Sequence, residues 1–530
     1  MSVTGKQLIG GQWQTGTSGS YHAINPATGE KLAPELSFAS EEQLRATTAA
    51  AAAAAPVFAA TSPEQRSRFL ETCADEIMAL GDELLDRVSA ETGYPRARAE
   101  GERGRTCGQL RMFAKYLVKG DYLDARIDTA LPDRQPMPRP DIRFCKHPIG
   151  PVVVFGSSNF PLAFSAAGGD TASALAAGCP VIVKSHNSHP GSGELVARAL
   201  ARAAKQCDMP AGVISFLAGN RNEIGVNLVT APEVKAVGFT GSTRGGMALY
   251  KLASNRPDPI PFFGEMGSIN PLVVLPEVLK TSAAEIAEGF VGSLTLGTGQ
   301  FCVNPGLVLG LKGPELNTFM EATGAALADK PAGVMLNQAV AEGYASGAAH
   351  LSDQPGVRQV STGKAQETDA GFCGQAHLYA VNAEEFITNP ALQEEVFGPC
   401  SLVVECRDTD ELSQVINSLS GQLTGTLHGT EAELADAKEL VRLLEQRVGR
   451  VVFNNFPTGV EVTDAMMHGG PFPAATDSRF TSVGTAAIDR FIRPVCYQNS
   501  PQDLLPPALR NDNPWGLRRL VNGEWQDGQI

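Results

Sequence analysis

The chain has 530 residues and a formal net charge of −14, from 43 Lys and Arg against 57 Asp and Glu. The length predicts roughly two to four domains, and the 43% share of hydrophobic residues is typical of globular proteins with large cores. The acidic balance argues against nucleic acid or an anionic membrane as the main partner, because both bind basic surfaces.

Three further features of the composition bear on compartment and metals. No run of about 18 apolar residues occurs, so no membrane span is expected, and the N-terminus lacks the apolar core of a signal peptide. The ten Cys are scattered without a C-x-x-C motif, which favours reduced thiols in a cytoplasmic protein. The eight His show no zinc spacing, so no metal site is expected.

The N-terminal part is predicted to be mostly helical after strands and turns over residues 8–38. Ser40 and Gln43 have the spacing of a capping box, which begins an alanine-rich helix. Pro63 suits the first position of the next helix. The helices after the first are expected near 62–80, 81–92 and 97–117, and the Pro- and Asp-rich stretch 121–140 indicates an extended arm or linker.

From residue 150 the pattern changes to short apolar runs that alternate with helices, which is typical of a parallel sheet covered on both faces. The first series has runs at 151–155, 181–183, 213–217 and 234–239, with helices near 166–177, 194–206 and 223–229. A second series has runs at 272–275, 306–311, 402–404 and 451–454. The sequence therefore predicts two doubly wound α/β domains in tandem.

The C-terminal segment differs from both series. The last 50 or so residues lose the helical pattern and hold many Pro and Arg, which suits an arm that packs on a partner subunit. Residues 8–16 and 520–528 match at five of nine positions, and each indicates a hairpin that turns at glycine. We interpret the match as shared hairpin chemistry, with a duplicated docking hairpin as the alternative.

Three polar residues are candidates for catalysis. Cys302 follows Gly297-Thr-Gly-Gln-Phe, where small residues let the backbone approach a ligand. Glu265 has an apolar, glycine-lined setting, which is expected to raise its pKa toward that of a general base. Asn159 follows the run 151–155, where open α/β sheets bind ligands, and its amide can donate to an oxyanion. Taken singly, each has an ordinary structural alternative: a buried thiol, a solvated carboxylate and a turn amide.

Two segments are candidates for binding a nucleotide. Gly241 and Ser242 follow the run 234–239 and begin a helix, whose N-terminus attracts phosphate, although the G-x-G-x-x-G fingerprint is absent there. Lys184 ends the run 181–183 and precedes Ser-His-Asn without an acid. Because a site that prefers a ribose 2′-OH offers it Asp or Glu, this pocket tolerates a 2′-phosphate. A plain strand-to-helix turn and a solvated strand end are the alternatives.

The order and spacing of these groups resemble the aldehyde dehydrogenase superfamily over nearly the whole chain. The residues that carry the resemblance are Asn159, Lys184, Gly241, Ser242, Glu265, Cys302 and Glu395-Val-Phe-Gly-Pro399. Segments at 456–462, 467–471 and 477–495 resemble the branch of 2-oxoglutarate semialdehyde (2,5-dioxovalerate) dehydrogenases. A related branch oxidises long-chain aldehydes with NADP.

The resemblance implies an aldehyde-dehydrogenase-like fold with a small β oligomerisation arm. The implied nucleotide-binding domain spans 1–120 and 141–264, and the catalytic domain spans 265–470. Residues 121–140 and 471–530 would form the oligomerisation arm and the C-terminal tail. Burial of the arm implies a homodimer or homotetramer. The resemblance also implies a small-molecule aldehyde as the substrate.

The resemblance also implies roles. Cys302 attacks the aldehyde as a thiolate, Asn159 and the Cys302 N–H hold the oxyanion, and Glu265 activates the water that hydrolyses the thioester. The implied cofactor contacts are Lys184, His186, Asn187, Gly219, Gly241, Ser242, Glu395 and Phe397. Asn187 stands where the superfamily commonly has Glu, so NADP is expected to be preferred, with NAD as the weaker alternative.

Substrate contacts are expected from Phe160, Ala163, Arg111, Phe456 and His468. Ala163 and Ala167 suggest a roomy entry, and His468 is expected to approach Cys302, with a purely structural role as the alternative. A dicarboxylic semialdehyde needs a cation, for which Arg103, Arg105 and Arg111 are candidates. A fatty aldehyde would need the same entry to be apolar.

The leading hypothesis is NADP-preferring oxidation of 2-oxoglutarate semialdehyde to 2-oxoglutarate. One alternative is an NADP-dependent dehydrogenase of fatty or other medium- to long-chain aldehydes. Another is a thiol esterase or hydrolase that uses Cys302 and His468 with Asn159. A catalytically silent homologue is the third alternative.

Overall fold

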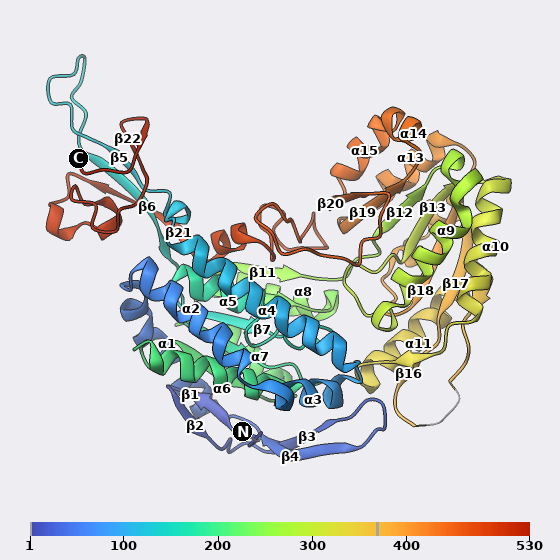
Figure 1. Cartoon of the computed structure of the whole chain (residues 1–530), viewed down its shortest axis with the longest axis horizontal. Helices are drawn as coiled ribbons and strands as arrows, with labels where there is room; N and C mark the ends of the chain where they lie inside the picture. Colours follow the sequence, from blue (N-terminus) through green and yellow to red (C-terminus); the bar gives the residue numbers. More distant parts are fainter. Residues whose placement is uncertain (1–2, 367–369) are drawn as a thin grey trace.

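The computed structural model describes residues 3–366 and 370–530, which form two α/β domains and a projecting arm (Figure 1). The strands of the first sheet are β1 (Gln7–Ile9), β2 (Gln12–Gln14), β7 (Val152–Phe155), β8 (Val181–Lys184), β9 (Ile214–Leu217), β10 (Ala236–Thr240) and β11 (Phe262–Glu265). They run in the order β11-β10-β7-β8-β9-β1-β2. The strands from β11 to β9 are parallel, and the β1–β2 hairpin pairs antiparallel with β9.

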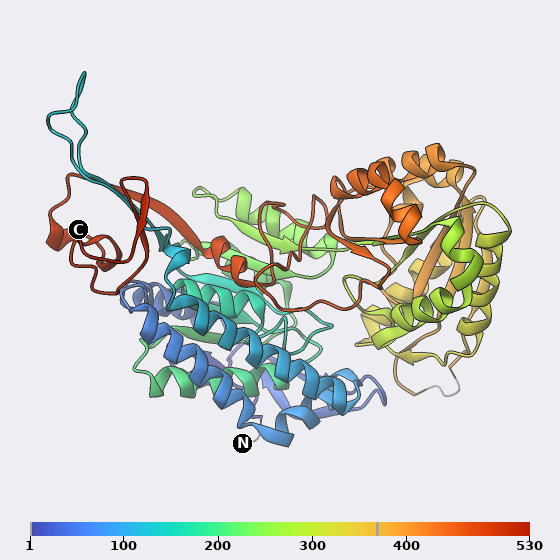
Figure 2. The same ribbon diagram turned by 45° about the horizontal axis from the view of Figure 1, so that its top comes forward.

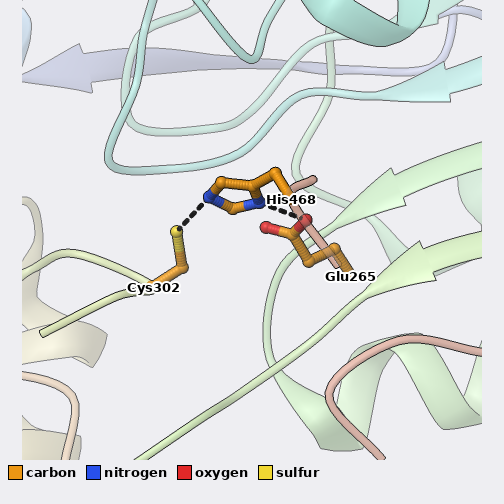
Figure 3. Close-up of side chains that lie close together, drawn as sticks. All are labelled: Glu265, Cys302 and His468. Carbon is orange, nitrogen blue, oxygen red and sulfur yellow. Dashed lines mark hydrogen bonds and ion pairs between the residues drawn. The ribbon is translucent and has the colours of Figure 1, made fainter. Parts of the chain in front are cut away.

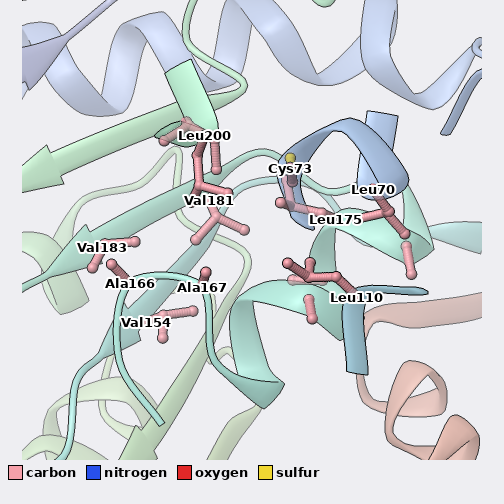
Figure 4. Close-up of a cluster of buried hydrophobic side chains, with 14 of the residues drawn as sticks. Leu70, Cys73, Leu110, Val154, Ala166, Ala167, Leu175, Val181, Val183 and Leu200 are labelled. Atoms are coloured by element: carbon pink, nitrogen blue, oxygen red, sulfur yellow. The ribbon is translucent and has the colours of Figure 1, made fainter. Parts of the chain in front are cut away.

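Helices cover both faces of this sheet, which explains its continuously apolar strands. They are α1 (Glu41–Ala59), α2 (Pro63–Met78), α3 (Gly81–Thr92), α4 (Arg96–Leu117), α5 (Gly169–Ala177), α6 (Pro190–Gln206), α7 (Asn222–Thr230) and α8 (Thr243–Ser254). Val154 and Val181 pack with Leu70, Leu110 and Leu175 from α2, α4 and α5 (Figure 4). The alternate residues of the same strands pack with α1, α7 and α8 on the opposite face.

The starts of the first two helices follow from local hydrogen bonding. Ser40 and Gln43 form the predicted capping box at α1, and Ser62 and Gln65 form a second one at α2. Each cap satisfies backbone N–H groups that have no partner inside the helix, which stabilises a helix by about 1 kcal/mol. A separate hairpin of β3 (Ser20–Ile24) and β4 (Lys31–Ser37) precedes α1.

The second domain repeats the same architecture. Its main strands are β12 (Pro271–Val274), β13 (Leu307–Leu311), β15 (Arg358–Thr362), β17 (His377–Asn382), β18 (Cys400–Cys406), β19 (Gln422–His428) and β20 (Val448–Phe453). Their order is β15-β17-β18-β13-β12-β19-β20, and all are parallel except β15. The two sheets confirm the predicted tandem of doubly wound domains, although β15, β17 and β19 were not predicted from the sequence.

Helices and a small ribbon complete the second domain. Helices α9 (Pro276–Thr295) and α10 (Pro314–Ala328) pack on one face of its sheet. The other face packs with helices α11 (Gln338–Ser352), α12 (Ala383–Thr388), α13 (Thr409–Ser418) and α15 (Lys438–Glu445), while α14 (Glu431–Asp436) precedes α15. Strands β14 (Gly333–Val334) and β16 (Cys373–Gly374) form a two-stranded antiparallel ribbon.

The arm is a separate sheet at one end of the molecule (Figure 1). Its strands are β5 (Arg126–Asp128), β6 (Ile142–Pro148), β21 (Ile492–Gln498), β22 (Arg519–Val521) and β23 (Glu524–Gln526), in the order β21-β6-β5-β22-β23. The sequence analysis placed β6 in the nucleotide-binding domain, but β6 pairs with β5 and β21 in the arm. The assignment of nucleotide binding and catalysis to particular domains stays a prediction.

The two sequence-related segments form hairpins with the same register. Leu8 pairs with Trp13 in β1–β2, and Leu520 pairs with Trp525 in β22–β23. Each turn has two residues with positive φ, as such tight hairpin turns require. Because the hairpins extend different sheets, the likeness lies in their turn chemistry.

The chain crosses between the domains more than once. After β20 it returns along the first domain before entering the arm (Figure 2). Ala475 forms a bridge with Glu265 of β11, and Arg490 forms a buried ion pair with Asp170 of α5 at 2.7 Å. The sequence analysis assigned all of 471–530 to the arm and tail, but these contacts place part of that range against the first domain. Among the described residues, no helix has the length and apolar character needed to cross a membrane.

We expect Arg490→Leu to lower the thermal stability strongly, because it leaves Asp170 buried without its cation, at a cost of about 3–5 kcal/mol. Differential scanning fluorimetry would measure the shift. Arg479→Leu is the control, since the Arg479 side chain is 78% exposed in its pair with Asp477 and such pairs contribute about 0–1 kcal/mol. Equal shifts in the two variants would contradict this prediction.

Candidate active site

The candidate residues of the first domain lie at one edge of its sheet. Lys184 ends β8, Gly219 follows β9, and Ser242 follows β10 as the N-cap of α8. Glu265 ends β11. The carboxyl ends of parallel strands are where open α/β sheets bind ligands, and the binding roles expected for these residues stay predictions.

Cys302 lies on the loop between α9 and β13 of the second domain. This loop has left-handed backbone at Gly297, Thr298 and Gly299. A Cβ at residue 299 would lie 2.3 Å from the Gly398 carbonyl carbon, so only glycine fits there. Asn270 Nδ2 donates to the Cys302 carbonyl oxygen at 2.9 Å. The loop is therefore held rigidly around the thiol.

His468 lies between Cys302 and Glu265 (Figure 3). Its Nε2 is 3.7 Å from Cys302 Sγ, and its Nδ1 is 2.6 Å from Glu265 Oε2. Ser482 Oγ donates to the same carboxylate oxygen at 2.9 Å. The His468 and Glu265 side chains are only 3% and 6% exposed. A nucleophile, an imidazole and an orienting carboxylate in this order are suited to proton transfer at the nucleophile.

The electrostatics of this pair differ from the sequence-based expectation. Burial would raise the pKa of Glu265, but the charge of His468 and hydrogen bonds from His468 and Ser482 hold it below its ordinary value. The expected raised pKa of Glu265 was therefore wrong, because its partner lies 203 residues away in the sequence. Burial would lower the pKa of His468, but Glu265 and Cys302 raise it to about 10. The two residues form a buried ion pair at neutral pH.

The same three side chains have donor atoms within 4.8 Å of one another, a spacing that ligands of one metal ion can have. The two ring nitrogens of His468 face different partners, one toward Cys302 and one toward Glu265 (Figure 3). A single ion needs all three donors to converge on one point, which this arrangement does not provide. The absence of a metal stays a prediction.

Asn159 contacts the loop that carries Cys302. Its Nδ2 donates to the Gln300 carbonyl oxygen at 3.0 Å, which leaves a second N–H of the amide for another acceptor. The main-chain carbonyl oxygen of Asn159 accepts hydrogen bonds from Arg98 Nη2 at 2.9 Å and from the Tyr94 hydroxyl at 3.3 Å. The Arg98 guanidinium stacks 3.5 Å over the Tyr94 ring. The sequence analysis missed this support, which depends on α4 packing against the site.

Some of the residues expected to bind adenosine form hydrogen bonds with one another. Lys184 Nζ donates to Asn187 Oδ1 at 3.1 Å, and burial lowers the pKa of Lys184 to about 8. His186 Nδ1 accepts a hydrogen bond from the Ser188 N–H. Burial, with the charges of His189 and Lys184, lowers the pKa of His186 well below its ordinary value. His186 is therefore neutral at neutral pH and can offer an anion a hydrogen bond but no charge.

Glu395 and Phe397 border a cavity of about 420 Å³ that also reaches Ser268 and Phe301. Glu395 accepts a hydrogen bond from the Ser268 N–H at 3.3 Å, and burial raises its pKa to about 7. A Cβ at Gly267 would lie 2.3 Å from Glu395 Oε2, so a larger residue there would displace the Glu395 carboxylate from this position. The cavity thus lies between the segment that joins β11 to β12, the Cys302 loop and the segment 394–398.

The residues expected to bind substrate fall into two groups. Phe160 packs with Phe301, Cys302 and Val460, and Ala163 lies beside Phe160 in an adjoining cluster. Phe456 packs instead against α9 and stacks on His428, with ring centroids 5.0 Å apart. The contact of Phe456 with the site was therefore predicted wrongly, because the loop after β20 turns this side chain outward.

Two other substrate-entry predictions are also corrected. Arg111 donates to Asp75 of α2 at 2.7 Å, so its guanidinium lies on the outer layer of helices and not at the thiol. Ala167 lies in the main hydrophobic core with Ala166 (Figure 4) and does not widen a substrate entry. Residues 105 and 111 are six positions apart on α4. At 3.6 residues per turn, their side chains are separated by about 240° around the helix axis and therefore point to different sides of the helix.

Comparisons with known proteins agree with this geometry. The sequence profile of the aldehyde dehydrogenase family matches residues 13–481, and the chain belongs to this family. Alpha-ketoglutaric semialdehyde dehydrogenase 2 of Azospirillum brasilense is 52% identical, with 99% of this chain and 100% of the relative aligned. Alpha-ketoglutaric semialdehyde dehydrogenase of Acinetobacter baylyi is 46% identical, with 98% of each chain aligned.

A solved structure shows the same fold at low sequence identity. A variant of aldehyde dehydrogenase C from Pseudomonas syringae, in complex with NAD⁺ and octanal, superimposes with a TM-score of 0.79 at 21% identity. The match covers 94% of this chain and 98% of that chain. The expected aldehyde-dehydrogenase-like fold is thus confirmed.

We expect His468→Gln to destabilise the protein more at pH 6.5 than at pH 5. Without His468⁺, burial raises the pKa of Glu265 above its unfolded value, so the cost grows as pH rises above about 4.5. In the wild type, the stability that comes from the raised pKa of His468 is fully present below about pH 6.5 and is lost as pH rises from there to about 10. Melting temperatures of both proteins at the two pH values provide the measurement.

Ser482→Ala is the matched control, because it removes a neutral donor from the same carboxylate and leaves the imidazolium in place. Its destabilisation should be about 1 kcal/mol and nearly equal at both pH values. If the melting temperature of His468→Gln is lower than that of the wild type by the same amount at both pH values, the imidazole contributes only packing.

Proposed function

We propose that this protein oxidises 2-oxoglutarate semialdehyde (2,5-dioxopentanoate) to 2-oxoglutarate, with NADP as the preferred electron acceptor. The printed names of the two relatives at 52% and 46% identity support the substrate. The chemistry rests on one observation, the buried series of contacts from Cys302 Sγ through His468 to Glu265.

The described residues fit a dinucleotide. The N-terminus of α8 presents free backbone N–H groups after the Ser242 cap, and such groups bind phosphate. Glu395 and Phe397 border the cavity beside the Cys302 loop. When bound there, nicotinamide would accept the hydrogen and electron pair that the aldehyde carbon gives up.

In the first half of the proposed reaction Cys302 Sγ forms a bond to the aldehyde carbon. The sulfur attacks as the thiolate, which the His468 imidazolium stabilises from Nε2, and Glu265 stabilises that imidazolium at Nδ1. The carbonyl oxygen takes the negative charge and accepts hydrogen bonds from Asn159 Nδ2 and the Cys302 N–H. Oxidation at the same carbon then leaves a thioester on Cys302.

In the second half a water oxygen bonds to the thioester carbon. Glu265 Oε1 is buried and has no hydrogen-bond partner among the described residues, so it is free to take the water proton. The C–S bond breaks and its electrons return to sulfur, where His468⁺ stabilises the thiolate. The carboxylate product leaves and Glu265 releases its proton to solvent.

The competing functions make different demands on these residues. A thiol hydrolase would use Cys302 and His468 with an orienting group, and here that group is Glu265, not Asn159. A hydrolase has no use for the strand-end residues that fit a dinucleotide. Oxidation of fatty or other medium- to long-chain aldehydes would share every step above, and only the substrate entry separates it from the leading proposal.

The NADP preference rests on charge at the end of β8. Lys184 Nζ donates a hydrogen bond to the side-chain amide of Asn187 and forms no ion pair with a carboxylate among the described residues. Arg221, which the sequence analysis overlooked, adds an exposed guanidinium two residues after Gly219. A pocket with cations and no carboxylate favours a 2′-phosphate. We further propose a cytoplasmic homodimer or homotetramer, since the arm and tail expose Met137 at 69% and Leu504 at 73%.

The central test is NADPH formation from 2-oxoglutarate semialdehyde and from a long-chain aldehyde such as decanal. We expect strong turnover of the semialdehyde and a loss of at least about 10³-fold in Cys302→Ala. Faster turnover of decanal would keep the mechanism and replace the substrate. No NADPH with either aldehyde, together with ester hydrolysis that depends on Cys302, would favour the hydrolase.

We expect Asn187→Glu to lower kcat/KM for NADP at least about 10-fold and to leave kcat/KM for NAD nearly unchanged. A carboxylate there would bind the Lys184 ammonium and repel a 2′-phosphate. Initial rates with both cofactors measure the ratio. Asn317→Glu, which adds the same charge on the exposed side of α10, is the control, and an equal change in both variants would contradict the proposed pocket.

A further inference from the structure

The three arginines that the sequence analysis considered for α4 have different surroundings. Arg103 donates to the Gly81 carbonyl oxygen toward α3, and Arg111 donates to Asp75 of α2. Arg105 alone of the three donates to the carbonyl oxygen of Val460, a residue that packs with Cys302 and Phe160. Arg105 is therefore the member of this set that lies beside the thiol.

Arg105 has hydrogen-bonding capacity that the described residues leave unused. A guanidinium carries five N–H donors, and Arg105 donates one hydrogen bond, to Val460, among these residues. Its Nε is buried without a partner. The described part of the chain also places no carboxylate within ion-pair distance of Arg105, although Glu102 and Glu461 act on it from further away. A buried cation with unpaired donors is costly unless an anion is bound there for part of the cycle.

A second guanidinium supports the same region from the opposite side. Arg450 of β20 donates to the carbonyl oxygens of Pro457 and Gly459, the latter at 2.7 Å. It thereby fixes the loop that carries Val460. Both arginines interact electrostatically with Cys302, so this side of the thiol is positively charged.

We propose that Arg105 binds the carboxylate of the aldehyde substrate, with Arg450 as a positioning residue that holds the 457–460 loop against it. The inference rests on the proposed function and deepens it. In 2-oxoglutarate semialdehyde the carboxylate carbon is four C–C bonds from the aldehyde carbon, roughly 5 Å when extended. The free Nε and Nη2 of Arg105 present the planar pair of donors that a carboxylate accepts in bidentate form. Phe160 and Val460 contact the methylene groups between the two ends.

The test compares 2-oxoglutarate semialdehyde with pentanal, a neutral aldehyde of the same length. For Arg105→Met we expect KM for the semialdehyde to rise about 10- to 100-fold, with kcat/KM for pentanal changed by no more than about twofold. Arg105→Lys should fall between wild type and Arg105→Met, because lysine keeps the charge and loses the fork. Arg111→Met, on the same helix but facing α2, should match wild type with both aldehydes.

A second measurement does not depend on turnover. 2-Oxoglutarate should protect Cys302 of the wild type from alkylation by iodoacetamide, and Arg105→Met should require at least about 10-fold more 2-oxoglutarate for the same protection. Equal losses with both aldehydes in Arg105→Met, or unchanged protection, would overturn the proposal and reduce Arg105 to a support for Val460. If the wild type does not oxidise the semialdehyde, the proposed substrate fails, and the protection experiment still decides whether Arg105 binds a carboxylate.

Discussion

The candidate active site depends on the buried ion pair between His468 and Glu265. Neither side chain is stable in that position alone, because burial disfavours the charge of each one. Together they hold the imidazole with Nε2 toward Cys302 and leave Glu265 Oε1 free. The segment 471–491 supplies Ser482 to the same carboxylate and is fastened to α5 by the Arg490–Asp170 pair. Two buried ion pairs thus connect the thiol, the end of β11 and the helical layer of the first domain.

Much of the fold could be predicted from local pattern. The runs 151–155 and 181–183 became β7 and β8 because fully apolar strands have few alternatives in a sheet covered on both faces. Strand β19 was missed because Gln422 and Thr424 interrupt its apolar run. Both side chains are buried and satisfied by tertiary hydrogen bonds with Ser268 and Asn270, which no local pattern announces.

The site was predictable in its residue types and less so in its electrostatics. Cys302, Glu265 and Asn159 were found through spacing within a family resemblance, but the direction of the Glu265 pKa depended on a partner far away in sequence. The choice between Arg105 and Arg111 depended on the rotational phase of α4, which packing against α2 and the loop at Val460 fixes. Arg98 lies in no motif, and the segment that contains Ser482 supported the family resemblance without indicating a contact with Glu265, so the sequence alone did not reveal how these two residues act on the site.

The three groups proposed for catalysis come from segments that lie far apart in the sequence. Glu265 ends the first sheet, Cys302 belongs to the second domain, and His468 lies on the return segment that precedes the arm. Each domain has its own core, so either can condense before the two are joined. In a half-assembled chain the thiol has no imidazole beside it and the carboxylate has no cation. Reactivity at Cys302 is thereby linked to completion of folding. In a nascent or misassembled chain, the Cys302 thiol lacks the imidazole that activates it.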